Sequence, residues 1–218
     1  FGKTVCIRQL GSTHSQTNDI FAVSAPWDDT GSTNEGKIEV HRLSVDNYGD
    51  NPSDWSADLQ PPGDTGQRNG QYPFEITPDG RKIIFSGTAG TAAPGKAWYF
   101  TRASDSSDYW SYQGQILPSS AASNADFGSF ITYDNGILAI GATSDTAPAG
   151  ATANAGTEYI FKENENGSFT EQAKIGANAP VGGEEFGCSI GLDATINDTL
   201  VVGMYDMDDG EVYIFEAG

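Results

Sequence analysis

A unit of sequence recurs four times along this chain of 218 residues, and this repetition limits the fold more than any other feature. The clearest copies begin with Phe127-Gly-Ser-Phe-Ile131 and Phe186-Gly-Cys-Ser-Ile190. In both copies an apolar run follows, and then a segment of the form Gly-x-x-Tyr-Ile-Phe. Copies begin at Phe1, Phe74, Phe127 and Phe186, which are 73, 53 and 59 residues apart. Repeats spaced in this way predict an array of similar small units.

Each unit is predicted to be a β-sheet. Short runs rich in β-branched and aromatic residues alternate with clusters of Gly, Asp, Asn and Pro, and no stretch shows the apolar spacing of an amphipathic helix. A fourth strand is expected near 54–59, 109–117 and 169–175. Four antiparallel strands per unit predict an all-β fold, a single β-propeller domain of about four blades with the last one incomplete. The expected blades are 1–70, 71–126, 127–185 and 186–218.

The charge of the chain excludes several classes of partner. Thirty acidic and eleven basic residues give a formal net charge of -19, which repels nucleic acids and anionic membrane surfaces. No run of eighteen apolar residues occurs, so membrane insertion is not expected. Cys6 and Cys188 are far apart and lack zinc-site spacing; either they pair or both are buried as small apolar side chains.

The repeated unit resembles a known family. Phe-Gly-x-x-Val/Ile, then an apolar strand ending in Gly-Ala or Ala-Pro, then Gly-x-Val/Tyr-x-Phe is similar to the FG-GAP repeat of integrin-type β-propellers, in its short-loop extracellular variety. The resemblance spans nearly the whole chain and is most specific at 22–29 and 35–40. It implies an extracellular or cell-surface module for adhesion or structural assembly, without catalysis. Asn166 and Asn197 stand in Asn-x-Ser/Thr sequences and are candidate glycosylation sites.

Calcium is the cofactor that the resemblance raises, because integrin-type blades often carry an Asp-x-Asp-x-Asp-Gly loop between their first two strands. None of the corresponding connections here has that full series of ligands. The nearest substitute is Asp206, Asp208 and Asp209, which lie between the expected second and third strands of the last unit. A hairpin turn with solvated acids is the alternative. Because Asp28-Asp29, Asp145 and Asp206 occupy equivalent connections, we expect them on one acidic rim.

Residue patterns for catalysis are weak. Gly187-Cys-Ser189-Ile-Gly191 has the letters of a nucleophile elbow, but that elbow requires a strand, a sharp turn and a helix, whereas another strand is expected here. His14 and His41 are the only histidines. The acidic pairs are neighbours in sequence with no sign that they face one another, so a glycoside hydrolase ranks third among the functions considered.

Exposed aromatic residues raise glycan binding as the main alternative function. Trp27 beside Asp28-Asp29 is the best candidate for a sugar-stacking platform, and Tyr205 is its counterpart in the last unit. A lectin of this kind is expected to repeat its site in every blade, yet the other two units have no aromatic residue at this position. Packing between repeats explains Trp27 equally well.

The last unit is expected to have an open edge. Its third strand contains Glu211, Val212, Tyr213, Ile214 and Phe215, and no fourth strand follows this segment before the sequence ends. An uncovered strand edge is a template for pairing with another chain. We therefore expect these residues to be either part of a longer polypeptide or a subunit whose edge is completed by a neighbour, in a homo-oligomer or a longer assembly that pairs along this strand. The alternative is that another segment, such as 45–59, closes the ring.

Overall fold

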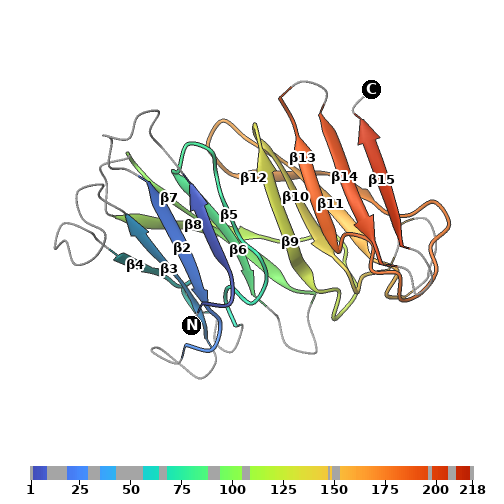
Figure 1. The fold of residues 1–218 in the computed structure, drawn as a ribbon, viewed down its shortest axis with the longest axis horizontal. Helices are drawn as coiled ribbons and strands as arrows, with labels where there is room; N and C mark the ends of the chain where they lie inside the picture. Colours follow the sequence, from blue (N-terminus) through green and yellow to red (C-terminus); the bar gives the residue numbers. More distant parts are fainter. Residues whose placement is uncertain are drawn as a thin grey trace. The chain divides into compact units, whose positions relative to one another are not determined.

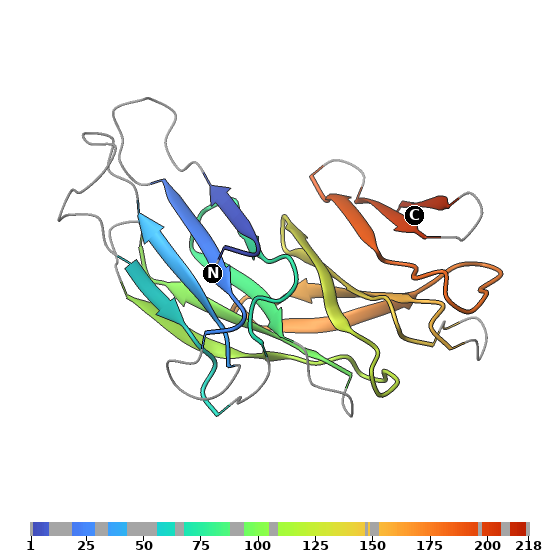
Figure 2. The same ribbon diagram turned by 60° about the horizontal axis from the view of Figure 1, so that its bottom comes forward.

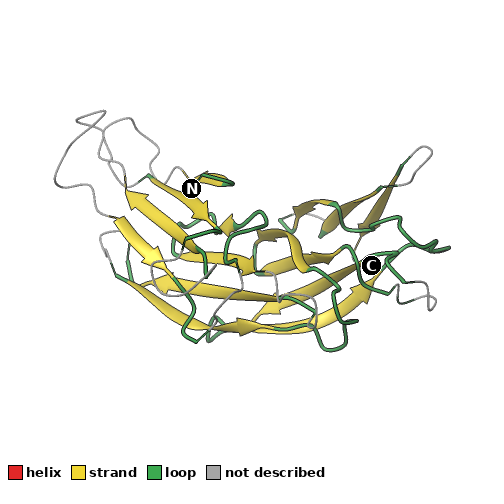
Figure 3. Ribbon diagram, turned by 90° about the horizontal axis from the view of Figure 1, so that it is seen from below, coloured by secondary structure: helices red, strands yellow, loops and turns green. Residues whose placement is uncertain are grey.

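The computed structural model describes residues 2–8, 19–28, 35–42, 56–63, 68–87, 94–104, 109–146, 148, 153–195, 198–205 and 210–216. These residues form fifteen β-strands and no helix (Figures 1 and 3), which confirms the all-β prediction. Among the residues described, there is accordingly no helix with the length and apolar character that crossing a membrane requires.

The strands form four antiparallel sheets, and in each sheet the strands follow the order of the sequence. The first sheet contains β1 (Val5–Arg8), β2 (Ile20–Ala25), β3 (Lys37–Arg42) and β4 (Ser56–Leu59). The second contains β5 (Glu75–Ile76), β6 (Lys82–Gly87), β7 (Lys96–Arg102) and β8 (Trp110–Ile116). The third contains β9 (Phe127–Asp134), β10 (Ile137–Ala142), β11 (Thr157–Glu163) and β12 (Phe169–Ile175). The fourth contains β13 (Ser189–Asp193), β14 (Thr199–Met204) and β15 (Glu211–Glu216).

The expected fourth strands are confirmed as β4, β8 and β12. Residues 56–59 pair with β3 in the first sheet, so this part of the segment 45–59 does not complete the fourth sheet. The turn at Asn135-Gly136 is also confirmed: both residues have positive φ angles, 43° and 84°, as a tight hairpin turn of type I′ requires.

The chain divides into two compact units. The first comprises 1–87 and 98–114, and the second 88–97 and 115–218. In the first unit, Phe74, Phe85, Trp98, Phe100 and Trp110 supply the aromatic part of a continuous core. Apolar residues from β2 and β3 complete that core. The single-domain organisation expected from the repeats stays a prediction.

In the second unit, the phenylalanine at the start of each repeat packs against two aromatic residues in the third strand of the same repeat. The ring of Phe127 meets those of Tyr159 and Phe161 edge to face, at centroid distances of 5.3 and 6.2 Å. Phe186 repeats this arrangement with Tyr213 and Phe215, at 5.4 and 6.2 Å. Edge-to-face contacts at these distances are favourable for aromatic rings, so the conserved spacing within the repeat reflects packing.

A glycine before the third strand of a repeat allows the next repeat to approach closely. At three such glycines φ is positive, and a Cβ atom would collide with the backbone at the start of the following repeat. We call these residues the contact glycines; the pairs are Gly36 with Asn69, Gly95 with Phe127, and Gly156 with Phe186. Two of the pairs are also parallel β-bridges. Only glycine satisfies both the conformation and the space.

Polar contacts join the first strands of neighbouring sheets within each unit. In the first unit, the Arg8 guanidinium on β1 donates to Glu75 Oε1 at 2.5 Å and to the carbonyl of Ile76 at 2.7 Å. In the second unit, Asp134 accepts a hydrogen bond from the Ala194 backbone N–H at 2.8 Å, and Asn135 donates to the Ala194 carbonyl at 3.0 Å. Both contacts fix how adjacent sheets lie against each other.

We predict that Gly156→Ala destabilises the fold more than Gly136→Ala. Both residues have positive φ, so either alanine costs about 1–2 kcal/mol of unfolding free energy through backbone strain. A Cβ at position 136 meets no atom within 4 Å, whereas at 156 it collides with the backbone of Phe186. Urea unfolding followed by circular dichroism measures the difference. Equal losses of stability in the two variants would show that the close approach at Gly156 does not matter.

Candidate functional site

The most exposed large apolar side chains within the strands of the fourth sheet lie on β15. This strand is at one edge of the sheet and leads to the C-terminal end of the chain (Figure 2). The strand pairs with β14 along its whole length, and no described strand pairs with its other side. Val212 and Ile214 are 69% and 66% exposed. Large apolar side chains with this exposure on an unpaired edge are unusual in a natural sheet, where edges are commonly protected by charges or by a covering segment.

Alternation along β15 explains which side chains are exposed. Tyr213 and Phe215 point to the buried side and pack against Phe186, Leu200 and Val202. Val212 and Ile214 occupy the opposite side, in register with Gly203 and Val201 of β14. We call Val201, Gly203, Val212 and Ile214 the bare face of the fourth sheet.

The hydroxyl of Tyr213 contributes a polar contact within the same strand. It donates a hydrogen bond of 2.6 Å to Glu211 Oε2. This hydrogen bond, together with burial and the charge of Glu211, raises the pKa of Tyr213 to about 12. The phenol of Tyr213 therefore stays neutral throughout the physiological pH range.

The candidate cation ligands Asp206, Asp208 and Asp209 lie outside the described residues. The segment is bounded by Met204, the buried last residue of β14, and by Gly210, which precedes β15. Within the described part of the chain, no group of three or more His, Cys, Asp or Glu side chains is arranged to hold a metal ion. Calcium binding stays a prediction.

The proposed aromatic platform is partly covered. Trp27 is 55% exposed, and the Arg68 guanidinium lies 4.2 Å from the centroid of its ring, a cation–π contact on one face. Asp28 lies 3.6 Å from Lys37 Nζ, which also binds Asp58 at 2.9 Å. Asp29 lies outside the described residues. Trp27 therefore offers one ring face at most for stacking, beside a carboxylate that is already paired.

Tyr205 follows β14 and is 59% exposed, so the counterpart of Trp27 in the last repeat is also accessible. The two residues belong to different compact units. Each is a separate surface feature of its own sheet.

The acidic rim expected to contain Asp145 is wrong for that residue, because its carboxylate is buried. Asp145 Oδ2 lies 2.7 Å from the Tyr159 hydroxyl and 3.0 Å from Lys174 Nζ, and its Oδ1 accepts from the Ala122 backbone at 2.8 Å. Burial, followed by the hydrogen bond to Asp145, raises the pKa of Tyr159 well above its ordinary value. A cation and two donors satisfy the carboxylate, so Asp145 holds loop 118–126 on the third sheet instead of facing solvent.

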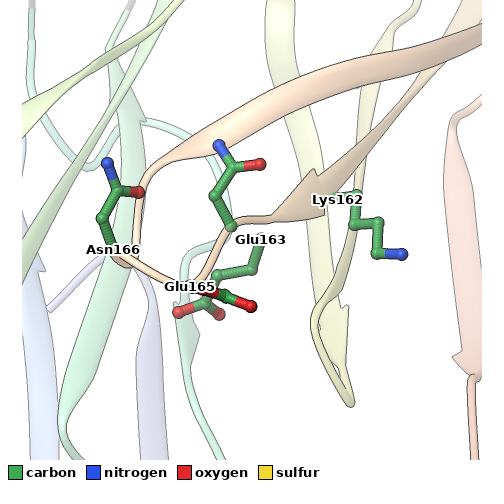
Figure 4. Close-up of a pocket in the computed structure, with 5 residues that line it drawn as sticks. Lys162, Glu163, Glu165 and Asn166 are labelled. Atoms are coloured by element: carbon green, nitrogen blue, oxygen red, sulfur yellow. The ribbon is translucent and has the colours of Figure 1, made fainter.

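The glycosylation candidate Asn166 lies in the turn between β11 and β12. Its Oδ1 accepts hydrogen bonds from the backbone and hydroxyl of Ser168, at 3.1 and 2.7 Å. Residues 162–166, from the end of β11 and this turn, line a shallow hollow (Figure 4). Asn166 is exposed there, whereas Asn197 lies outside the described residues. Glycosylation of either stays a prediction.

The catalytic patterns have ordinary positions in strands. Ser189 is the first residue of β13, which pairs with β14, so the helix of a nucleophile elbow does not follow it. His41 stacks on Phe21 at a centroid distance of 4.7 Å and lies 3.3 Å from Glu39; His14 is outside the described residues. Cys6 and Cys188 are free thiols in different units, and burial raises the pKa of Cys6.

Two carboxyl groups with raised pKa values, one partly buried and one fully buried, were missed by sequence reasoning. Glu75 is held by Arg8, but burial outweighs this partner and raises the pKa of Glu75 to about 6. Glu158 on β11 is fully buried, and neither of its carboxyl oxygens has a hydrogen-bond partner. Burial raises its pKa well above the ordinary value. The repeat alignment contained a sign that Glu158 is buried, because the equivalent residues of the first two repeats, Ile38 and Ala97, are apolar.

Glu158 lies between the third and fourth sheets. Its Oε2 would be 3.0 Å from a Cβ at Gly187, where the fourth repeat begins, and 3.5 Å from a Cβ at Gly141 on β10. Glycines at both positions therefore make room for the carboxyl group. In this apolar setting the neutral acid is the stable form.

We predict that Glu158→Gln stabilises the protein increasingly as pH rises. Below pH 4.5 the carboxyl is protonated in both folded and unfolded chains. Above it the unfolded chain releases the proton while the folded chain retains it, so wild-type stability falls by about 1.4 kcal/mol per pH unit until the raised native pKa is reached. The glutamine variant does not titrate. Urea unfolding between pH 4 and 8 measures this, with exposed Glu165→Gln as the control. A constant difference between wild type and Glu158→Gln would contradict the buried neutral acid.

A comparison with family models adds independent information on the repeat. Residues 169–215 match the model of the FG-GAP repeat, from β12 through the three strands of the fourth sheet. No curated protein matches the chain. FG-GAP repeats are blades of β-propellers, typically extracellular and generally non-enzymatic. Residues 169–215 thus match an FG-GAP repeat, and the four successive antiparallel sheets give the chain the all-β fold of β-propeller blades.

Proposed function

We propose that this protein is an extracellular, non-enzymatic structural or adhesion module that assembles with other copies or chains through the fourth sheet. The observation that supports this most directly is the edge strand β15, whose other side has no partner among the described strands. Its backbone donors and acceptors are available to pair with an added strand.

Energetics favour covering this surface. Burying an exposed Val or Ile side chain contributes about 1.5–3 kcal/mol, so Val212 and Ile214 together offset part of the entropy lost on association. Glu211 and Glu216 at the ends of β15 are exposed and negatively charged. These two glutamates favour a partner that is positively charged at the contact, or a salt concentration that screens their repulsion of a negatively charged partner.

Glycan binding is the second candidate, and the exposure of Trp27 supports it. One ring face carries Arg68, so a sugar would stack on the other. Calcium bound by Asp206, Asp208 and Asp209 belongs to the same alternative. A glycoside hydrolase ranks third. The hollow at residues 162–166 is lined by one continuous segment, the end of β11 and the turn that follows it.

We predict that the wild-type protein forms assemblies larger than 23.0 kDa and that Ile214→Lys reduces them at least tenfold at a given concentration. Lysine replaces a side chain that is 66% exposed, so the fold is retained. Light scattering on a sizing column at low and physiological salt measures the mass. Val181→Lys, at an apolar loop position that is 60% exposed, is the matched control. A monomeric wild type across the salt range would refute assembly.

A further inference from the structure

The contact between the third and fourth sheets shows how a covered sheet face is built in this protein. Ala139 and Ile160 of the third sheet pack against Phe186, Leu200 and Val202. Ile190 and Leu192 of β13 join the same cluster. One face of a sheet thus meets the opposite face of the sheet that follows.

The bare face of the fourth sheet is the same kind of face without its cover. In the repeat, Gly203 corresponds to Gly141, so Val201 takes the place of Ala139 and Ile214 that of Ile160. These positions remain apolar although they face solvent. A surface built like an interior contact is expected to receive the same kind of partner.

Gly210 indicates where the start of that partner belongs. It precedes β15 as the contact glycines precede β3, β7 and β11, and its φ of 66° is also left-handed. At each contact glycine the next repeat fills the space of the absent Cβ. At Gly210 the one atom near that position among the described residues is the Met204 carbonyl oxygen, at 3.4 Å. The left-handed glycine is present, and no described segment of another repeat lies against it.

The first sheet carries the complementary face. Val5 and Ile7 of β1 pair with Val23 and Phe21 of β2, just as Ile190 and Leu192 pair with Val202 and Leu200 in the fourth sheet. In the fourth sheet these positions cover the third sheet. In the first sheet, Val5 and Ile7 are 61% and 66% exposed.

We infer that the bare face of the fourth sheet binds the first sheet of a second copy of this chain, head to tail, with the segment that begins at Gly2 lying against Gly210. This inference rests on the proposed function and specifies its partner. The two faces differ, so the contact is heterologous, and repeating it generates rings or filaments of copies. Glu39 on one face and Asp193 and Glu216 on the other place like charges around the contact, whereas Asp58 is paired with Lys37, so salt strengthens the association.

Two single variants and their mixture test the head-to-tail contact. Ile7→Lys damages the face of the first sheet, and Ile214→Glu damages the bare face of the fourth. Each variant alone is expected to lose association by about tenfold or more, because every contact contains one damaged face. An equimolar mixture is expected to regain association, since the intact bare face of one variant meets the intact first sheet of the other. Light scattering at physiological salt measures all three samples, circular dichroism checks the fold, and Val181→Lys is the control.

The outcomes separate this inference from the function on which it rests. If Ile214→Glu weakens association but Ile7→Lys does not, the partner face is not the first sheet, and the head-to-tail contact is overturned while assembly through the fourth sheet stands. If both variants weaken it and the mixture fails to recover, the two faces do not meet each other, with the same consequence. A wild type that remains monomeric overturns both.

Discussion

The close approach of the backbone at the contact glycines is the constraint on which the rest of this structure depends. Each one lets the start of a repeat lie against the glycine of the repeat before it, at a distance that any side chain would prevent. Once Gly156 meets Phe186, the ring of Phe186 falls against Tyr213 and Phe215, and the fourth sheet is anchored through its own aromatic residues. The repeat spacing is therefore a packing requirement, met by successive short antiparallel sheets.

Asp145 and Glu158 are both buried in the third repeat, but their carboxyl groups have different surroundings. Asp145 is buried with Lys174 and Tyr159, and these donors satisfy its carboxylate while it holds a loop in place. Glu158 has no such partner and keeps its proton. Two acids of one repeat thus have different surroundings, because one contacts a cation and the other lies among glycines and an apolar sheet. A strongly acidic chain need not present every carboxylate to solvent.

The exposed sheet faces are the surfaces that a partner can reach. Within each compact unit, the sheet faces that meet are used for packing and offer little to a partner. Val5 and Ile7 on the first sheet and Val212 and Ile214 on the fourth are exposed versions of residues that are buried elsewhere in the same repeat. These residues can form a contact with a partner through the same apolar packing that joins successive sheets inside the protein.

The sequence by itself determined the all-β class, the four repeats, nearly every strand and the exposed edge at 211–216. These features follow from local patterns: alternating apolar residues, turn residues such as Asn135-Gly136, and glycines at fixed positions. Only the tertiary structure decided the fate of the acids and aromatic residues. Asp145 and Trp27 read as surface groups in the sequence, yet Lys174 and Arg68 meet them from segments 29 and 41 residues away. Whether a carboxylate or a ring is free depends on which distant side chains reach it, and local sequence carries no record of that.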